Sequence, residues 1–334
     1  MKAEGLDKIF NDFNQLKALI IGDVMIDAYM WGSVTRISPE APVPIVSVTK
    51  RENRLGGAAN VALNIQAMGA TPILCSIIGA DEKSGLFLEL LQKQGLSNKG
   101  IIKDNSRKTT VKTRIIGNNH QMLRVDSESE NESNTAATTN LFDKIQEIIS
   151  AENIDVIIFE DYDKGVITSA LIDKVTELAK EKLIPIAVDP KKRNFMAYKE
   201  VSLMKPNINE LKEGLKSDFN HKNDDELFLA VNELREKLNL PFALVTLSDR
   251  GILAATDKEN TIIPAHVRNI ADVSGAGDTV ISVAALCLAL NLPVSTIASL
   301  ANLAGGLVCE YVGVVPVNKS HLYKEAINFG HIFQ

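Results

Sequence analysis

Positions 271–279 bring small residues and two carboxylates together in the order Ala-Asp-Val-Ser-Gly-Ala-Gly-Asp-Thr. The apolar run at 280–290 predicts a helix that begins within this stretch. A helix that begins in Gly-Ala-Gly directs unpaired N–H groups and the positive end of its dipole at one point, and that point suits a phosphate. Asp278 falls in the first turn, where a carboxylate can accept the proton of an attacking hydroxyl. The stretch therefore predicts phosphoryl transfer.

The same stretch has a simpler interpretation, because Gly-x-Gly before an apolar helix also forms a tight turn and an N-terminal Asp is an ordinary cap. A second glycine-led helix start favours the chemical interpretation. Positions 54–60 read Arg-Leu-Gly-Gly-Ala-Ala-Asn and precede an amphipathic run that ends at Gly69. Two such features in one chain fit a two-substrate site.

Composition narrows the class of protein. The chain has 334 residues, a formal net charge of −6 and 45% hydrophobic residues, which argues against a disordered or polyanion-binding protein, so nucleic acid is not an expected partner. The N-terminus does not read as a signal peptide and no apolar run reaches bilayer-spanning length, so we expect no membrane partner. Three separated cysteines in apolar surroundings, Cys75, Cys287 and Cys309, predict buried thiols and a cytoplasmic location.

Strand and helix patterns alternate along the chain. We predict strands at 17–23, 72–78, 156–159, 184–188, 201–204 and 243–247, and helices at 58–68, 83–94, 140–150, 168–182 and 280–290. This alternation predicts a single α/β domain over 1–334, with a mostly parallel sheet flanked by helices on both faces. Polar loops follow four of the strands, at 160–165, 189–193, 205–210 and 248–251. Because parallel strands end at one edge, we expect the site there.

Two other segments do not follow this alternation of strands and helices. Apolar residues alternate with polar ones at about 29–50 and 110–125, which predicts strands outside the main sheet. If these strands pair, they form a small β-lid over the site, with one side polar toward ligand. Such a lid also predicts a homodimer through its other side.

Three motifs carry a family resemblance. Gly56-Gly57-Ala58-Ala59-Asn60, Asn207-x-x-Glu210 and 272–278 resemble, in order and spacing, the motifs of the ribokinase or pfkB-type sugar kinase family. The resemblance covers nearly the whole chain and implies a ribokinase-like fold that uses ATP and Mg²⁺.

Within that family, positions 36–44, 161–165 and 189–191 resemble the kinases of D-glycero-β-D-manno-heptose 7-phosphate. Those kinases make the 1,7-bisphosphate, for ADP-heptose and the lipopolysaccharide core. In many bacteria the kinase is fused to a nucleotidyltransferase with a His-x-Gly-His signature, which does not follow here, so we expect a stand-alone kinase.

The resemblance implies a role for each motif residue. Asp278 is the expected general base for the C1 hydroxyl, and Gly275, Ala276 and Gly277 form the expected anion hole. The Asn-x-x-Glu motif, with Ile208 and Asn209 between its ends, implies contacts to nucleotide phosphates and to Mg²⁺, mostly through water. Asn207 and Glu210 also read as a helix cap with its N3 partner, and the two interpretations are compatible.

The nucleotide side includes a further loop and helix. Ser248, Arg250 and Gly251 match the family's nucleotide loop, although Ser248 stands where the family usually has Gly. The adenine is expected between 264–267 and the helix that carries Asn302.

A monovalent cation, K⁺, is a further implied ligand. Asp272 and the Ser274 carbonyl match positions that bind one in related kinases, and a turn-stabilising Asp is the alternative.

On the acceptor side, Asp27, Gly57 and Asn60 match residues that bind sugar hydroxyls, and a helix cap is the alternative for Asp27. Asp161 is a further expected substrate contact. The expected cations for the acceptor phosphate are Lys191, which we favour, Lys164, Arg36, Lys112 and Arg124.

Two other functions are alternatives. One is a kinase of the same fold for ribose or a hexose phosphate, and the other is a non-catalytic ligand sensor that retains the fold. A nicotinamide-dependent dehydrogenase is not expected, because the first strand lacks the Gly-x-Gly-x-x-Gly fingerprint.

Overall fold

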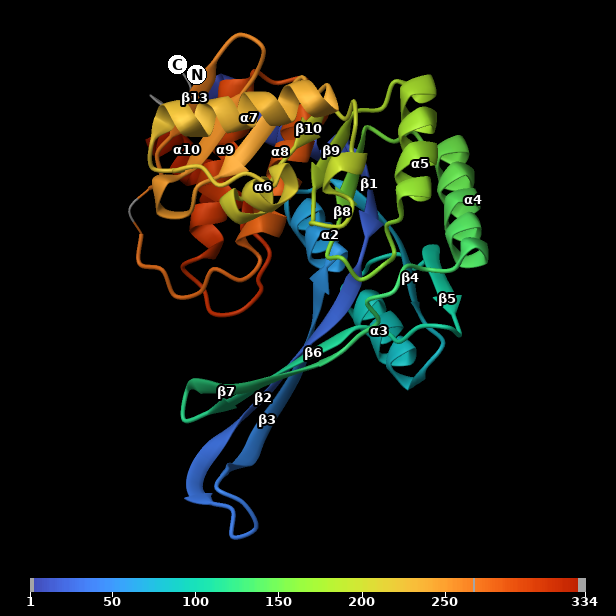
Figure 1. Ribbon diagram of the computed structural model, residues 1–334, viewed down its shortest axis with the longest axis vertical. Coiled ribbons are helices and arrows are strands. Elements are labelled where there is room, and N and C mark those ends of the chain that lie inside the picture. The colour runs from blue at the N-terminus through green and yellow to red at the C-terminus, as the bar shows by residue number, and fades with distance from the viewer. Residues whose placement is uncertain (1–2, 267, 330–334) are drawn as a thin grey trace.

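The structure is a computed structural model that describes residues 3–266 and 268–329. Its body is built on one large sheet (Figure 1). Across that sheet the strands run in the order β13 (Asn260–Ile263), β12 (Ile252–Ala255), β11 (Ala243–Thr246), β10 (Leu203–Met204), β9 (Ile186–Asp189), β8 (Val156–Glu160), β1 (Lys17–Gly22), β4 (Thr71–Gly79) and β5 (Gly100–Asp104). Neighbouring strands from β5 to β11 are parallel, whereas β12 pairs antiparallel with both β11 and β13.

Helices cover both faces of this sheet (Figure 1). One face packs against α1 (Ala3–Asp12), α2 (Ala58–Ala67), α3 (Glu82–Lys93), α8 (Ala276–Ala289), α9 (Val294–Val308) and α10 (Lys319–Asn328). The other face packs against α4 (Thr135–Ala151), α5 (Ser169–Lys182), α6 (Ile208–Leu215) and α7 (Asp224–Leu238). Short 3₁₀ turns lie at Phe13–Gln15, Phe195–Ala197 and Ser248–Arg250.

The central strands are apolar on both faces because helices bury both. In β1, Leu19 and Ile21 belong to one core cluster while Ile20 belongs to the other. Successive side chains of a strand point to opposite faces, so this division follows from the pleat. The α/β class with helices on both faces is therefore confirmed.

A second sheet of four strands projects from the body as a long lid (Figure 1). Its order is β3 (Pro44–Gly57), β2 (Val24–Ile37), β6 (Val111–Gly117) and β7 (His120–Ser127). Only Asp23 separates the end of β1 from the start of β2, and β3 runs directly into α2. The segments expected at 29–50 and 110–125 fall in this sheet, whose strands begin closer to the body than the alternating pattern indicates.

Some elements differ from the sequence prediction. The helix expected at 140–150 begins earlier, at Thr135, because Asn134 caps it by accepting from the Ala137 N–H at 2.9 Å. The strand expected at 201–204 contains only Leu203–Met204. The prediction expected a helix capped by Asn207 and a helix that carries Asn302 but gave no bounds for these two, α6 and α9. It did not include β5, β12, β13, α1, α7 or α10.

The structure also bears on the expected buried cysteines, on membrane-spanning helices and on the loop expected beside adenine. All three cysteines are free and buried, as predicted. Over the described ranges, no helix combines the length and apolar character that crossing a bilayer requires. Val267, at the end of the expected adenine loop, lies outside the described residues.

Candidate active site

The start of α8 has the geometry that its sequence predicts. Gly275 is the N-cap residue with φ 82°, a conformation that glycine adopts without strain, and α8 begins at Ala276. A Cβ on Gly275 would also lie 3.1 Å from Nδ2 of Asn60. Asp278 lies in the first turn and is only 4% exposed. The N–H groups of a first helical turn have no acceptor within the helix, so this turn forms a cradle that an anion can occupy, although the Ala276 N–H already donates to the Val273 carbonyl at 3.2 Å.

Two side chains from distant parts of the chain hold the Asp278 carboxylate. Asn60 Nδ2 donates to Oδ2 at 2.7 Å, and the Tyr162 hydroxyl donates to Oδ1 at 2.8 Å. Burial raises the pKa of Asp278 to about 6, although both hydrogen bonds stabilise the charged form and oppose that rise. A carboxylate with this pKa is ionised near neutral pH and is a suitable acceptor of a proton.

Tyr162 is a residue that the sequence analysis did not assign to the site. It follows β8 in a loop that Asp23 organises: the Asp23 carboxylate accepts from the N–H groups of Tyr162 at 2.9 Å, Lys164 at 3.1 Å and Val166 at 3.0 Å. This anchor directs the Tyr162 hydroxyl at Asp278. Burial raises the pKa of Tyr162 well above its usual range, so the hydroxyl stays a donor.

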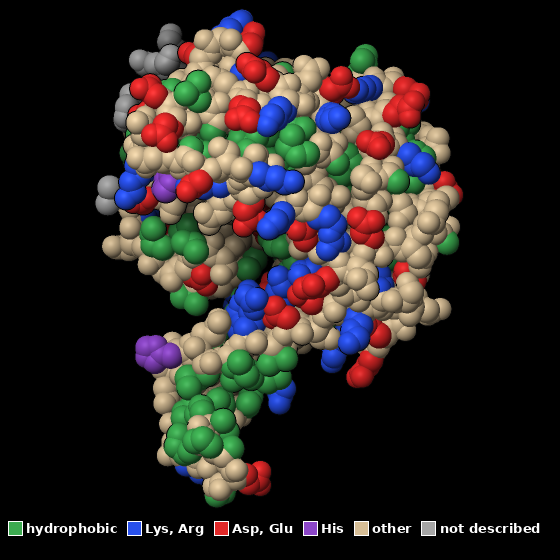
Figure 2. Space-filling model, in the orientation of Figure 1, with side chains coloured by type: hydrophobic (Ala, Val, Ile, Leu, Met, Phe, Trp, Pro, Cys, Tyr) green, Lys and Arg blue, Asp and Glu red, His purple; other side chains and the backbone are tan. Residues whose placement is uncertain are grey.

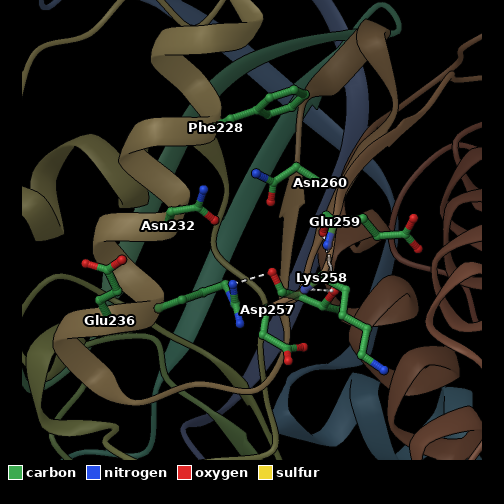
Figure 3. A pocket seen from close by; sticks show the side chains of 9 residues that line it. Phe228, Asn232, Glu236, Asp257, Lys258, Glu259 and Asn260 are labelled. Atoms are coloured by element: carbon green, nitrogen blue, oxygen red, sulfur yellow. Dashed lines mark hydrogen bonds between the residues drawn. The ribbon is translucent and has the colours of Figure 1, made fainter.

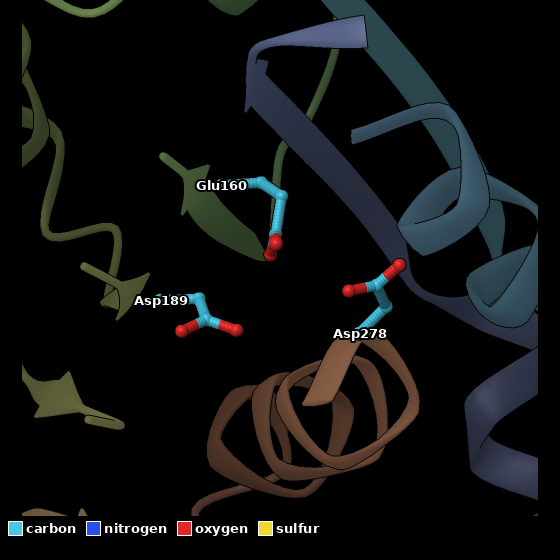
Figure 4. A group of neighbouring side chains, drawn as sticks. All are labelled: Glu160, Asp189 and Asp278. Carbon is cyan, nitrogen blue, oxygen red and sulfur yellow. The ribbon is translucent and has the colours of Figure 1, made fainter. Parts of the chain in front are cut away.

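Three buried carboxylates meet at the carboxyl edge of the sheet (Figure 4). Oxygens of Glu160 at the end of β8, Asp189 at the end of β9 and Asp278 all lie within 4.8 Å of one another. Burial raises the pKa of Glu160 well above its usual range, and the charges of Asp189 and Asp278 raise it further. Oε2 of Glu160 is buried without a hydrogen-bond partner. Such a set of oxygens fits a divalent cation.

Lys205 supplies a positive charge to this cluster. Its Nζ lies 2.8 Å from Oδ2 of Asp189, and the side chain is 3% exposed. Burial opposes its charge, but the carboxylates of Asp189 and Glu210 prevail and raise the pKa of Lys205. Nζ of Lys205 and Oδ2 of Asp189 each lie 3.6 Å from the position that a Cβ on Gly277 would take, so this ion pair faces the anion cradle.

The Asn-x-x-Glu motif forms the predicted capping box. The Asn207 side chain accepts from the Glu210 N–H at 2.9 Å, and Oε2 of Glu210 accepts from the Asn207 N–H at 2.8 Å. Oε1 of Glu210 pairs with Lys191 Nζ. Ile208 and Asn209 lie between the two in the first turn of α6. The magnesium role of Asn207 and Glu210 stays a prediction.

The other residues expected on the nucleotide side lie in two places. Ser248 has φ 58° and Gly251 has φ 95°, and Arg250 between them donates to Asp224 Oδ1 at 2.5 Å and to the His221 carbonyl. Asn302 in α9 donates to the Pro264 carbonyl at 2.9 Å and so joins the two segments expected around adenine.

The Asp272 carboxylate stabilises the turn before α8. It accepts from the Ser274 N–H at 3.0 Å and from the Gly313 N–H at 2.9 Å. This geometry fits the turn-stabilising alternative directly. A role in binding a monovalent cation stays a prediction.

Two of the expected acceptor cations lie over the ring of Tyr162, and a third belongs to the same loop. Nζ of Lys112 and Nζ of Lys191 each lie 5.6 Å from the centroid of its ring. Lys164 is two residues further along the same loop, and its Nζ pairs with Glu128 at 2.7 Å. We call Lys112, Lys164 and Lys191 the lysine group. Blue side chains gather where the lid meets the body (Figure 2).

Three more of the residues expected to bind the acceptor lie on strands of the lid. Asp27 is a buried strand residue rather than a helix cap, and it forms an ion pair with Arg114, which the sequence analysis did not single out. Arg36 is exposed near the far end of β2. Arg124 on β7 is paired with Asp126 at 2.9 Å.

Asp161 has partners inside the body. Its carboxylate accepts from the Tyr198 hydroxyl at 2.7 Å, from Asn194 Nδ2 at 3.1 Å and from the Asp163 N–H at 2.9 Å. These bonds fix the loop that carries Tyr162. The substrate contact expected of Asp161 stays a prediction.

A separate cavity of about 590 Å³ lies between α7 and the turn from β12 to β13 (Figure 3). None of the predicted site residues is among its lining residues, which are Phe228, Asn232, Arg235, Glu236, Thr256, Asp257, Lys258, Glu259 and Asn260. Because β12 runs antiparallel to β11, this turn lies at the opposite end of the strands from Asp278.

Comparison with known proteins agrees with this geometry. The sequence matches the family described as pfkB family carbohydrate kinase over residues 15–320. This chain belongs to the pfkB family. The pfkB kinase is therefore an enzyme of carbohydrate phosphorylation, and the family resemblance of its motifs is confirmed.

Curated relatives of this pfkB kinase include two that carry the name Bifunctional protein HldE. The protein from Aliarcobacter butzleri is 38% identical over 306 residues, which are 92% of this chain and 63% of that protein. The protein from Geobacter sulfurreducens is 35% identical over 323 residues, which are 96% of this chain and 65% of that protein. The chain thus spans less than two thirds of the length of either relative.

Solved structures confirm that this pfkB kinase has the ribokinase-like fold. Escherichia coli phosphofructokinase-2 in complex with potassium superposes with a TM-score of 0.79 at 16% identity, covering 96% of this chain and 99% of that chain. Arabidopsis thaliana ribokinase with ribose and ATP gives a TM-score of 0.71 at 15% identity, covering 92% and 98%.

Replacement of Tyr162 tests the state of Asp278 in this pfkB kinase. Tyr162→Phe removes a donor that stabilises the carboxylate, so the pKa of Asp278 rises above about 6. Protonated Asp278 cannot accept a proton, so activity falls on the acid side. We expect the acid limb of kcat/KM, measured from ADP release between pH 5 and 8, to move to higher pH. Tyr323→Phe is the matched control, because it removes a hydroxyl in α10 that donates to Asp7 in α1. The same limb in both variants would contradict the assignment.

Proposed function

We propose that this kinase transfers the γ-phosphoryl group of ATP to the C1 hydroxyl of D-glycero-β-D-manno-heptose 7-phosphate. The observation that carries the proposal is the Tyr162 side chain, which donates to the buried Asp278 carboxylate and has lysine ammonium groups beside its ring. A proton acceptor and a cluster of cations at one site suit an acceptor that has both a hydroxyl and a phosphate. The motif resemblance and the curated relatives named HldE support the heptose assignment.

The reacting hydroxyl is proposed to lie against Asp278. Its proton passes to the carboxylate as the oxygen attacks, and the N–H groups at 275–277 stabilise the negative charge on the transferred group. Lys205 faces the same cradle and adds a fixed positive charge. Asn60 and Tyr162 keep the Asp278 carboxylate oriented toward the acceptor.

Mg²⁺ is the proposed metal ion, and bound to the nucleotide it reduces the negative charge on the phosphates. Asn207 and Glu210 are proposed to hold it mostly through water. The unpartnered Oε2 of Glu160 beside Asp189 offers further oxygens, so the residues present fit this ion. Asp272 and the Ser274 carbonyl are proposed to hold K⁺, and the potassium complex of the E. coli phosphofructokinase-2 supports that choice.

The remainder of the acceptor is proposed to lie between the lid and the body. Asp27, Gly57 and Asn60 contact the sugar hydroxyls, and the lysine group binds the 7-phosphate. Arg114 beside Asp27 belongs to the same face of the lid, because Arg114 is opposite Tyr29 and Lys112 is opposite Asp27 in the register.

The acceptor and Asp278 are tested together. We measure ADP release from MgATP with heptose 7-phosphate, fructose 6-phosphate and ribose, and expect strong turnover with the heptose phosphate alone. Asp278→Asn should lower kcat by about two orders of magnitude or more while MgATP still binds, which is the size that loss of a general base gives. Turnover with another sugar would discard the heptose assignment, and near-normal turnover of the variant would remove Asp278 from the mechanism.

Lys191 separates acceptor binding from nucleotide binding. Lys191→Ala removes one charge-assisted contact to the acceptor phosphate, so we expect the KM for that acceptor to rise about tenfold or more while the KM for ATP changes little. Lys192→Ala is the matched control, because Lys192 is the exposed neighbour whose Nζ is 3.8 Å from Glu213. A rise confined to the KM for ATP would instead place Lys191 with Glu210 on the nucleotide side.

We also propose that two copies associate through the lids. Val48, Leu123 and Val125 are 41%, 56% and 49% exposed on the lid face opposite Asp27, and Figure 2 shows apolar side chains gathered on the lid. Light scattering should give twice the mass of one chain, and Leu123→Glu should give the single mass. Leu183→Glu, at a 90% exposed leucine after α5, is the control that should stay dimeric. A monomeric wild type would contradict this proposal.

A further inference from the structure

The segment 309–314, which we call the bridge segment, holds the turn before α8. The Cys309 carbonyl accepts from the Asp272 N–H at 3.2 Å, and the Gly313 N–H donates to Oδ2 of Asp272 at 2.9 Å. The other oxygen of Asp272 accepts from the Ser274 N–H at 3.0 Å. The Cys309 carbonyl and the Gly313 N–H of the bridge segment thus both hold Asp272, the residue at the start of the turn that leads to the anion cradle.

The lid contacts the same bridge segment from the other side. Nη1 of Arg54 in β3 donates to the Val314 carbonyl at 3.3 Å, and Nε pairs with Glu52 at 2.6 Å. A Cβ on Gly313 would lie 2.7 Å from Nη1 of Arg54 and 3.4 Å from the Tyr29 hydroxyl, and Gly313 has φ 76°. The bridge segment therefore has a glycine where two lid side chains approach its backbone.

The bridge segment also contacts the anion cradle through a side chain. Cγ1 of Val314 lies 3.3 Å from the position that a Cβ on Gly275 would take. Val314 accordingly contacts Arg54 through its carbonyl and the N-cap of α8 through its side chain. Close-packed contacts of this kind transmit a displacement because little free volume absorbs it.

We propose that Arg54 is a positioning residue, through which the base of the lid and the anion cradle set each other's geometry. This inference rests on the proposed function, since it takes 275–278 as the place where a nucleotide phosphate binds. Coupling between two sites is reciprocal. A nucleotide in the cradle therefore alters the lid, and an acceptor beneath the lid alters the cradle, with Arg54 and the bridge segment between them.

The lid contains its own reporter of this coupling. Trp31 is the single tryptophan of the chain, and its ring stacks on Tyr29 with centroids 5.2 Å apart and an interplanar angle of 12°. The guanidinium of Arg54 lies over the same Tyr29 ring, 5.0 Å from its centroid. A change at Arg54 therefore reaches Trp31 through one aromatic contact, and Trp31 fluorescence reports on the lid alone.

The experiment titrates the full chain with MgADP and records Trp31 emission, while calorimetry gives the Kd of MgADP. We expect the wild type to show a saturable change in emission. Arg54→Ala should lose this change and lower kcat about tenfold, a size typical of site-to-site coupling, while the Kd of MgADP stays within about threefold. Arg51→Ala, on the opposite face of β3 where Arg51 contacts Met30, should behave as the wild type.

Arg54→Lys keeps the charge but lacks the fork that joins Glu52 to Val314, so it should retain only part of the emission change. If circular dichroism shows that Arg54→Ala does not fold, Arg54→Lys alone tests whether Arg54 couples the lid to the anion cradle. A wild-type emission change in either Arg54 variant would overturn the proposal. So would MgADP binding to the wild type without any change at Trp31, or a rise in acceptor KM with kcat unchanged. Failure of MgADP to bind at all would overturn the proposed function as well.

Discussion

Three carboxylates share one buried space at the carboxyl edge of the main sheet, and the site is arranged around their mutual repulsion. Glu160, Asp189 and Asp278 come from two strands and one helix, so none can move away without moving its element. Lys205 offsets part of the charge, and the positive end of α8 offsets more. A further cation, such as Mg²⁺ with a nucleotide, is what this arrangement is suited to receive.

Burial in this space explains the state of Asp278. In water an aspartate of ordinary pKa is a weak base, but burial raises the pKa of Asp278 to about 6. Asn60 and Tyr162 prevent a larger rise by donating to both oxygens. These donors come from α2 and from the loop that Asp23 anchors, so the chemistry of one carboxylate depends on two parts of the fold that are remote in sequence.

The sequence predicts those parts of the site that are encoded locally. The helix start at 275–278 and the capping box of Asn207 and Glu210 each lie within a few consecutive residues, where residue type fixes backbone conformation. The family motifs lie in the same places. The alternation of strands and helices likewise predicts most of the sheet and its covering layers. The strands β5, β12 and β13, of five, four and four residues, leave little pattern to detect.

The remaining parts of the site depend on which strand ends become neighbours. Glu160, Lys205 and Tyr162 are ordinary polar residues at or just after the end of a strand, and only the strand order brings them to Asp278. The sequence also does not show how far along the lid a residue lies from the body. The register of β2 against β6 decides that Lys112 is near the body while Arg36 is far from it. Local pattern contains no measure of that distance.

The two irregularities of β2 divide the lid into a near part and a far part. Its pairing with β3 is continuous from Val24 to Trp31, then shifts between Trp31 and Gly32 and again between Val34 and Arg36. A bulge bends a ribbon locally and separates the twist on its two sides. The near part, which carries Asp27 and Arg54, thus has a continuous register of its own on the body side of the first irregularity. A change in the length or surface of the far part therefore leaves the register of the near part, and the geometry that it sets at the site, as they are.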